Sequence, residues 1–516
     1  MRLTEFQQAA ITRRAMMTGA LGALAATSLP GGALAAQKKG GVLRISYGFQ
    51  PTSLDPTFGR QGGDFGFLYP VFETLVDWEP HSLQPKPGLA ASWNFPEPKT
   101  LVMKLREDVV FHDGTPFDGA AAKFNLDRGL SDPKSTVKAD LASVESVEAS
   151  GKHEITFHLK RPNIALPGIL SDRAGLMASP AAIQKFGDGF ARNPIGTGPW
   201  AFVQWRDNEL VSYRRNDYYR IKGLPYLDGV DFHIIADANT GLRSVVAGEN
   251  DFVQSLSTGQ KPVVDKAGLA YTFATSQAMF PLWLNYAKGP LADIRVRQAL
   301  NHAIDRDAYN KATELGLNEV AWGVFPKAHW AYSAAVDKAY PYNPDKAKQL
   351  LAAAGFANGL DLTMTGPTDQ RSTQRQEVVM EQLKAVGVRI KLTALSVNDS
   401  IKAFFYDKQH DMLLILWGGR ADPSATYDAL FSKASPFNAS GVEADGFADA
   451  LAASQAVPDL KQRAAALGKV AQIVSDNALM VPLVFDAQYN AYTKAVKGFE
   501  SNLFGRMRLD TVSLES

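Results

Sequence analysis

The last third of the chain alternates strand-like and helix-like segments, and this alternation restricts the fold more than any other feature. Apolar and polar residues alternate at 360–364 and again at 388–392, as in half-buried strands. Between them, 378–386 carries apolar residues at helical spacing. Two strands joined through a helix imply a parallel sheet covered by helices. The apolar run at 412–416 predicts a further buried strand.

Cap and turn residues delimit the neighbouring elements. Asn343 as N-cap, Pro344 at the first helical position and Gly355 beyond the end predict a short helix. A later helix leads into a strand at 480–485. Because Pro482 in this strand has no backbone N–H to donate, we expect the strand at an edge of the sheet.

The first part of the chain has a different pattern, typical of an α+β region. Residues 41–46 predict a short strand, and apolar residues alternate at 101–105 and at 155–159. Between the latter two strands, an Asp-Gly turn at 113–114 leads into a helix over 118–130. The chain as a whole is therefore expected to be α/β with an α+β part near its start.

Residues 291–306 predict a single amphipathic helix with Asp293 as its N-cap. Its apolar stripe consists of Val296, Leu300, Ala303 and Ile304, and its outward face of Arg295, Arg297 and Gln298. Such a helix packs against a core in many proteins, so its periodicity alone indicates no function.

Length and composition set the class of protein. A chain of 516 residues is too long for one core and implies two or three domains. Basic and acidic side chains nearly cancel, at 54 and 53, and no basic tract stands out, so we expect no nucleic-acid partner. The absence of cysteine excludes disulfides, thiolate metal sites and a cysteine nucleophile.

Residues 1–36 have the features of an export signal. The pair Arg13-Arg14 precedes a mildly apolar, Gly/Ala-rich run, and Ala33-Leu34-Ala35 offers a cleavage site. The paired arginines favour the twin-arginine (Tat) route over an ordinary Sec signal. No later run of about 18 apolar residues follows, and no cysteine could carry a lipid anchor. We therefore expect a protein free in the periplasm.

Signatures of catalysis or metal binding are lacking. The eight histidines are scattered, and no HExxH, GxSxG or GxxxxGK[ST] motif is present. We expect no catalytic residues, no metal and no cofactor. A periplasmic hydrolase, the alternative from another class, would need a nucleophile–base pair or a metal cluster.

A candidate ligand-binding loop follows the strand at 412–416. Trp417 offers a flat apolar surface, Gly418 and Gly419 allow a ligand to approach the backbone, and Arg420 can pair with an anion. Ligands of open α/β sheets bind at the carboxyl ends of strands, where this loop lies. A packed tryptophan beside a surface arginine is the alternative.

Several segments resemble one known family. They are DIRVRQALNHAIDR at 293–306, LREDVVFHDGTPFDGAAAKFN at 105–125 and NPIGTGPW at 193–200. The chain resembles the family 5 extracellular solute-binding proteins, the receptors of ABC importers for peptides, nickel and oligosaccharides. The resemblance implies a two-lobe periplasmic binding protein fold, type II-like, with an extra inserted α+β domain. It places the first lobe at 41–72, 196–282 and 487–516, the inserted domain at 73–195 and the second lobe at 283–486.

The resemblance also implies site residues. Peptide-binding members carry an aspartate about three residues after the tryptophan to anchor the peptide amine, whereas this chain has Arg420 there. Because a guanidinium prefers carboxylate or phosphate, the preferred ligand charge is inverted, unless Asp422 takes the amine through a small shift. The other candidates implied are Arg173 (which could instead pair with Asp172 at the surface), Phe65 and Asp64. Tyr427, just beyond the loop at 417–423, is a candidate from the loop itself.

These expectations combine into one functional hypothesis. The protein captures a small peptide or related solute between its lobes and delivers it to an inner-membrane ABC permease, acting as a monomer. A carboxylate-rich solute, an opine-like conjugate or a nickel or other metal chelate is the alternative ligand class. A chaperone or sensor that reuses the fold without transport is a further possibility.

Overall fold

The strand–helix–strand unit expected in the last third of the chain is present in the computed structural model, which describes residues 39–59 and 62–515. Strand β13 (Leu360–Pro367), helix α10 (Gln370–Lys384) and strand β14 (Val388–Leu395) follow one another, and the two strands pair in parallel. Strand β15 (Met412–Leu414) pairs in parallel with the other side of β13. The prediction of a parallel sheet covered by a helix is confirmed for this part.

This unit belongs to a ten-stranded sheet with the order β14-β13-β15-β12-β16-β11-β1-β10-β9-β8. Strands β12 (Ala270–Leu284) and β16 (Met480–Tyr492) pair antiparallel in its middle. The expectation that Pro482 marks an edge strand is therefore wrong. Pro482 lies opposite Pro281, beside a shift in register, so the two residues without an N–H face each other where the ladder is already irregular.

The other half of the sheet comes mainly from the first half of the chain. It consists of β11 (Phe252–Val253), β1 (Val42–Tyr47), β10 (Gly229–Ile234), β9 (Leu210–Arg215) and β8 (Trp200–Arg206). β1, the strand expected at 41–46, is parallel to both of its neighbours, β10 and β11.

A separate four-stranded antiparallel sheet lies within residues 90–159. Its order is β4 (Ala90–Glu97), β5 (Thr100–Leu105), β7 (Glu154–Leu159) and β6 (Val144–Gly151). Helix α2 (Gly119–Ser131) packs on β6 and β7 and begins at Asp118, whose side chain accepts from the backbone N–H of Ala121. The expected α+β character of this part is confirmed.

The single helix expected over 291–306 is in fact two. Helix α7 (Ile294–Ala303), capped by Asp293 as predicted, ends where Ile304 turns extended, and α8 (Arg306–Glu314) then begins with Asp305 as its own cap. The apolar stripe of the prediction is buried, as expected. Arg297, expected on the outward face, is buried instead, because its guanidinium donates to the carbonyl oxygens of Leu291, Ala292 and Asn477.

The remaining helices are α1 (Phe65–Val71), α3 (Leu166–Ile169), α4 (Pro180–Phe186), α5 (Ala238–Val246), α6 (Lys261–Ala267), α9 (Pro344–Ala353), α11 (Val397–Ile401), α12 (Pro423–Phe431), α13 (Phe447–Ser454) and α14 (Leu460–Asp476). The remaining strands are β2 (Val76–Trp78), β3 (Pro85–Pro87), β17 (Val496–Lys497) and β18 (Ser513–Leu514). As predicted, Asn343 caps α9 by accepting from the N–H of Lys346.

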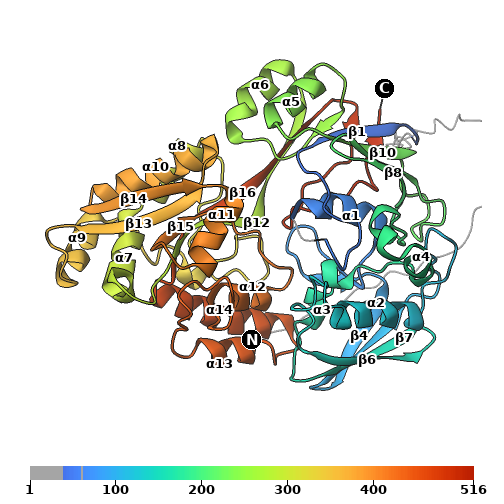
Figure 1. Cartoon of the computed structure of the whole chain (residues 1–516), viewed down its shortest axis with the longest axis horizontal. Helices are drawn as coiled ribbons and strands as arrows, with labels where there is room; N and C mark the ends of the chain where they lie inside the picture. Colours follow the sequence, from blue (N-terminus) through green and yellow to red (C-terminus); the bar gives the residue numbers. More distant parts are fainter. Residues whose placement is uncertain (1–38, 60–61, 516) are drawn as a thin grey trace, which may run out of the picture. The chain divides into compact units, whose positions relative to one another are not determined.

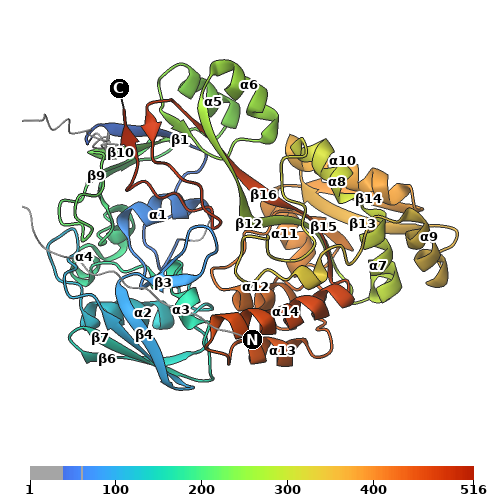
Figure 2. The ribbon, with the colours of Figure 1, turned by 180° about the vertical axis from the view of Figure 1, so that it is seen from behind.

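Buried apolar side chains form three large clusters that divide the described chain. The first, within 279–485, defines what we call the second lobe. The second draws on 43–72, 176–252 and 496–512 and defines the first lobe. The third, within 75–177, defines the inserted region. Figures 1 and 2 show β12 and β16 as long strands that run from one lobe to the other.

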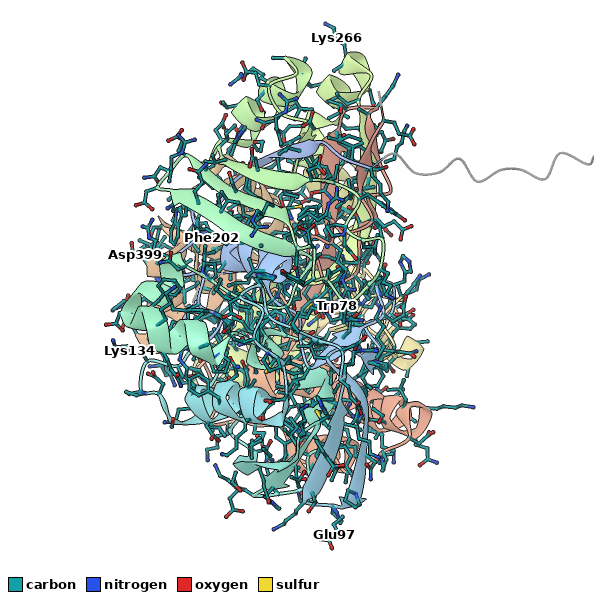
Figure 3. The ribbon with its side chains drawn as sticks, turned by 90° about the vertical axis from the view of Figure 1, so that its right-hand side faces the viewer. Trp78, Glu97, Lys134, Phe202, Lys266 and Asp399 are labelled. Carbon is teal, nitrogen blue, oxygen red and sulfur yellow. The ribbon has the colours of Figure 1, made fainter. Side chains whose placement is uncertain are left out.

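Surface and interior follow ordinary rules of burial. In Figure 3, Glu97 at the end of β4 and Lys266 in α6 point outward, whereas Trp78, which is 1% exposed, lies among interior side chains. No helix within the described residues is long and apolar enough to cross a membrane. The expected signal at 1–36 lies outside the described residues.

Candidate functional site

A cavity of about 430 Å³ lies where the first lobe, the inserted region and the second lobe meet. Such a volume is typical of sites for small molecules. Its lining consists of Phe65, Asp140, Ile169, Asp172, Arg173, Ile401, Trp417, Gly418, Gly419, Arg420, Ala421, Asp422, Ala425, Phe437 and Arg506. Six of the eight residues proposed from the sequence are therefore brought together at one cavity.

Trp417 follows β15 and forms a rigid part of the second-lobe wall. Its backbone exchanges hydrogen bonds of 2.8 and 2.9 Å with Met279 of β12, which fixes its position. The indole packs edge-on against Trp283 and Phe437 and is 8% exposed. Its Nε1 is buried and has no hydrogen-bond partner in the described part of the chain. Because this nitrogen is buried, Trp417 contributes an apolar surface to the wall and no exposed donor.

The two glycines after Trp417 differ in how well their positions would accept a side chain. Gly419 has a φ of +75°, and a Cβ there would lie 2.8 Å from Cδ of Gln277, so an L-residue would be strained. At Gly418 an added Cβ would meet nothing within 4 Å.

Arg420 follows these glycines. Its backbone N–H donates to Oγ1 of Thr426 at 3.0 Å, and the guanidinium carbon of Arg420 lies 5.5 Å from the centre of the Trp417 ring.

Asp422, the alternative anchor for an amine, is already engaged within the second lobe. Its carboxylate accepts from both Nη atoms of Arg463 at 2.9 and 2.7 Å and from the N–H of Ser424 at 2.9 Å. Both Asp422 and Arg463 are buried. The pair holds the start of α12 in place, and its charges compensate each other.

Arg173 begins the 3₁₀ turn at Arg173–Gly175 and forms part of the opposite wall. It does not pair with Asp172 at the surface, because one Nη donates to the carbonyl oxygen of Gly59. Its guanidinium carbon lies 5.5 Å from the centre of the Phe65 ring. Gly175 makes this turn possible, since a Cβ there would lie 1.8 Å from the carbonyl oxygen of Leu170.

Two of the candidates do not line the cavity. Asp64, which is 1% exposed, accepts from the N–H and the hydroxyl of Thr52 at 2.7 and 2.6 Å, so it fixes the preceding loop. Tyr427 is also 1% exposed, and its ring packs edge-on against Phe325 within the second-lobe core. Its position in the first turns of α12 explains the burial, because the opposite face of the helix meets the cavity through Ala425.

Charged lining residues that the sequence did not suggest are Asp140, Asp172 and Arg506. Asp140 and Asp172 come from loops of the inserted region, and Arg506 comes from the C-terminal segment after Gly505, which has a φ of +77°. The only local signal is the Phe504-Gly505-Arg506 turn, which places a cation after a tight bend. Nothing in the sequence around Asp140 distinguishes it from an ordinary surface aspartate.

Electrostatics at the cavity are dominated by burial and by the arginines. Burial raises the pKa of the Asp140 carboxyl, and nearby Asp172 raises it too, while Arg420 and Arg173 act in the opposite direction. Asp172 accepts from the Tyr69 hydroxyl at 3.3 Å and lies 3.8 Å from a guanidinium nitrogen of Arg506. The cavity is therefore lined by charges of both signs.

The two sides of the cavity touch each other beside it. The N–H of Ile164 donates to the carbonyl oxygen of Gln455 at 3.0 Å, and the N–H of Trp330 donates to that of Ser82 at 3.1 Å. Gly168 of α3 packs so closely on Asp422 that a Cβ would lie 2.7 Å from its carboxylate oxygen. The second lobe thus closes directly on the inserted region and on the loop that follows Trp78.

The arrangement can bind a charged solute, and its donor set is not that of a metal site. Within the described residues, no group of three or more histidine, cysteine, aspartate and glutamate side chains could hold a metal ion. The functional groups at the cavity are guanidinium, carboxylate, indole and backbone groups, which recognise a ligand through charge and hydrogen bonding.

Comparison with known proteins gives the family. The model of the bacterial extracellular solute-binding proteins, family 5 middle, matches residues 84–438. Glutathione-binding protein GsiB of Escherichia coli (strain K12) is 33% identical over 306 residues, which cover 58% of this chain and 59% of that protein. GsiB of Pectobacterium atrosepticum is 33% identical over 303 residues, 58% of each chain. This chain thus spans less than two thirds of the length of these curated relatives.

Solved structures agree in fold over nearly the whole described chain. The periplasmic binding protein DppA from Helicobacter pylori, solved in complex with the peptide STSA, has a TM-score of 0.81 at 25% identity, covering 93% of this chain and 99% of that one. HbpA2 from Haemophilus parasuis has a TM-score of 0.81 at 25% identity, covering 92% and 100%. The expected α/β two-lobe fold is confirmed, and the chain belongs to family 5 of the bacterial extracellular solute-binding proteins.

Proposed function

We propose that this protein is the solute-binding component of an ABC importer and that it captures a small peptide in the cavity described above. The observation that carries the proposal is the cavity itself, which is enclosed by both lobes and the inserted region and lined by three arginines. The relatives support the class of ligand, since GsiB is named glutathione-binding and the DppA structure contains a peptide.

In this proposal, Arg420 takes the place of an amine anchor and pairs with a carboxylate of the ligand. Trp417 supplies an apolar wall, while Gly418 and Gly419 let the ligand reach the backbone. Arg173 and Phe65 complete the site from the opposite side. Pairing inside a closed cavity is strong because the low local polarity increases the attraction between charges.

Delivery requires the cavity to open. We assign the first lobe to 41–72, 196–282 and 487–516, the inserted domain to 73–195 and the second lobe to 283–486. The direct contacts between Ile164 and Gln455 and between Trp330 and Ser82 correspond to a closed form. Opening is a hinge motion about β12 and β16, the two strands that run between the lobes.

The cellular setting is part of the same proposal. The protein is exported by the Tat route, works as a monomer in the periplasm without a lipid anchor, and hands its ligand to an inner-membrane permease. It performs no chemistry on the ligand, as befits relatives that are binding proteins. It has no nucleic-acid partner.

Isothermal titration calorimetry of Arg420→Glu tests the role of the site. The ligands are Ala-Ala, glutathione, glutarate and citrate, and Arg161→Glu, which alters an exposed arginine outside the cavity, is the control. We expect Arg420→Glu to weaken binding of every carboxylate ligand that the native protein binds by about 2 kcal/mol or more, roughly thirtyfold. Unchanged affinities would remove Arg420 from the site, and turnover of a bound ligand would overturn the receptor function.

A further inference from the structure

Arg506 is held in the cavity wall by aromatic rings. Its guanidinium carbon lies 3.4 Å from the centre of the Phe65 ring and 4.4 Å from that of Phe504, and its side chain is 16% exposed. The backbone on both sides is fixed, because the Asn502 amide donates to the Arg506 carbonyl oxygen and accepts from its N–H. A guanidinium held this way loses little entropy when it binds an anion.

Arg506 and Arg173 form a pair around one ring. Both guanidinium groups lie over Phe65, one at 3.4 Å and the other at 5.5 Å. In each, Nε is buried without a hydrogen-bond partner among the residues that the structure describes. Because these Nε atoms are covered by protein, a ligand carboxylate can reach the two guanidinium groups only through their other nitrogens.

Asp140 differs from these two arginines, because it is acidic and no neighbouring side chain holds it. Its carboxylate lines the cavity but forms no ion pair or hydrogen bond with any described residue. Arg420 and Arg173 act on it only at longer range. A carboxylate at this position of the cavity wall can pair with an ammonium group of a ligand.

The charged side chains that line the cavity determine the net charge that a bound ligand should carry. Asp422 is compensated by Arg463, which does not line the cavity, so three guanidinium groups face two carboxylates, those of Asp140 and Asp172. One positive charge remains in excess. A ligand that balances it carries one more carboxylate than ammonium groups.

We propose that the ligand is a small peptide with two carboxylates and one ammonium, and that Asp140 binds the ammonium while Arg420 and the pair Arg173–Arg506 each bind a carboxylate. This assignment rests on the proposed function and makes it more specific. It places the amine on the inserted region and a carboxylate beside Trp417, the reverse of an amine anchored on the second lobe. Asp172, 3.8 Å from Arg506, keeps that guanidinium directed along the wall.

The test uses matched ligands that differ by one charged group. Glutathione carries two carboxylates and one ammonium; glutaryl-cysteinylglycine lacks only the ammonium, and glutathione glycinamide lacks one carboxylate. Calorimetry with the native protein should give at least tenfold tighter binding of glutathione than of either analogue. Asp140→Asn should bring the ratio of glutathione to glutaryl-cysteinylglycine close to one and leave the preference over the glycinamide in place.

In this assignment Arg420 binds the carboxylate beside the ammonium, so the glycine carboxylate binds the pair Arg173–Arg506. Arg506→Gln should therefore do the converse, reducing the preference over the glycinamide and keeping the preference for the ammonium. Asp188→Asn and Arg161→Gln, at exposed positions outside the cavity, should change neither ratio, and thermal unfolding should show all four variants folded. A variant that fails to unfold cooperatively is replaced by Asp140→Ser or Arg506→Lys, which must weaken the same preference in part.

The outcomes separate this assignment from the function on which it rests. If the native protein binds Ala-Ala or glutathione glycinamide as tightly as glutathione, or if Asp140→Asn leaves the ammonium preference unchanged, the assignment is wrong and the receptor function stands. If the native protein binds neither glutathione nor a panel of neutral and acidic di- and tripeptides, both fall.

Discussion

On the second-lobe side of the cavity, one stretch of chain from Trp417 to Ala425 supplies most of the lining, whereas the opposite side is assembled from four separate places, represented by Phe65, Asp140, Arg173 and Arg506. The first wall is stiffened by contacts within its own lobe, such as the pair Asp422–Arg463. The second depends on the packing of the first lobe against the inserted region. We therefore expect substitutions in the continuous wall to affect stability as well as binding, and substitutions in the assembled wall to affect mainly selectivity.

The largest effect should come from breaking the ion pair behind the continuous wall. Asp422→Ala leaves the buried guanidinium of Arg463 without its partner and removes the cap of α12. We expect a loss of about 3–5 kcal/mol in the free energy of unfolding, measured by urea denaturation. The control is Asp361→Ala, which breaks an exposed ion pair with Arg389 and should cost far less, because exposed ion pairs contribute little to stability. Equal losses in the two variants would contradict the comparison.

A second substitution tests the assembled wall. Gly175→Ala forces a methyl group against the carbonyl oxygen of Leu170, 1.8 Å away, so the turn that carries Arg173 must shift. We expect a loss of about 1–3 kcal/mol in unfolding free energy and weaker ligand binding. Gly189→Ala, where an added Cβ meets nothing within 4 Å, should change neither quantity. Tight native-like binding by Gly175→Ala would show that the assembled wall tolerates displacement.

The pH dependence of the unfolding free energy tests both sides of the cavity, because each side contains one buried histidine. Burial lowers the pKa of His112 in the inserted region to about 4 and that of His329 in the second lobe to about 3. In the unfolded chain both titrate near 6.5. Below that pH the unfolded chain takes up protons that the folded chain does not. The stability is therefore complete above about pH 6.5 and is lost as the pH falls toward the folded pKa values.

The expected slope is about 1.4 kcal/mol per pH unit for each histidine, measured by urea unfolding between pH 6 and pH 5. His329→Asn keeps an oxygen that can accept from the N–H of Ala331, as Nδ1 does, and should reduce the slope by that amount. His112→Gln should do the same from the other side. His81→Asn, at an exposed position, serves as the control. A slope unaffected by both substitutions would mean that other groups govern the acid sensitivity.

The smallest expected effect concerns the contact between the two walls. Gly168→Ala places a methyl group 2.7 Å from the carboxylate of Asp422, which Arg463 holds in place, so the lobes cannot close fully. We expect ligand affinity to fall about fivefold, or about 1 kcal/mol, with no loss of stability, because alanine suits helix α3 better than glycine. Gly151→Ala, with only an ordinary contact at 3.5 Å, is the control. An affinity equal to that of the native protein would show that closure does not require this contact.

The contrast between a wall made by one stretch of chain and a wall assembled from distant segments also explains what could be predicted from the sequence. The strand–helix–strand unit, and the loop from Trp417 to Arg420 that lines the cavity, can be predicted because periodicity and residue type act over short stretches. Arg297 and Pro482 were misplaced, since their surroundings come from Asn477 and from Pro281, far away in the chain. Asp140 and Arg506 were missed for this reason too, because no local pattern reports which distant segments meet at a cavity.

The register shift between β12 and β16 bears on how fast the lobes open and close. The pairing of β12 with β16 shifts register between Thr275 and Met279, where the hydroxyl of Ser276 donates to the carbonyl oxygen of Asp486. A continuous ladder of backbone hydrogen bonds resists bending, and the sheet bends more easily where the ladder is interrupted. Motion between the lobes should therefore concentrate in this short stretch, and substitutions there should alter how long a captured molecule dwells more than how tightly it is held. The residence time of the ligand would then be set by two strands that contribute no residue to the cavity.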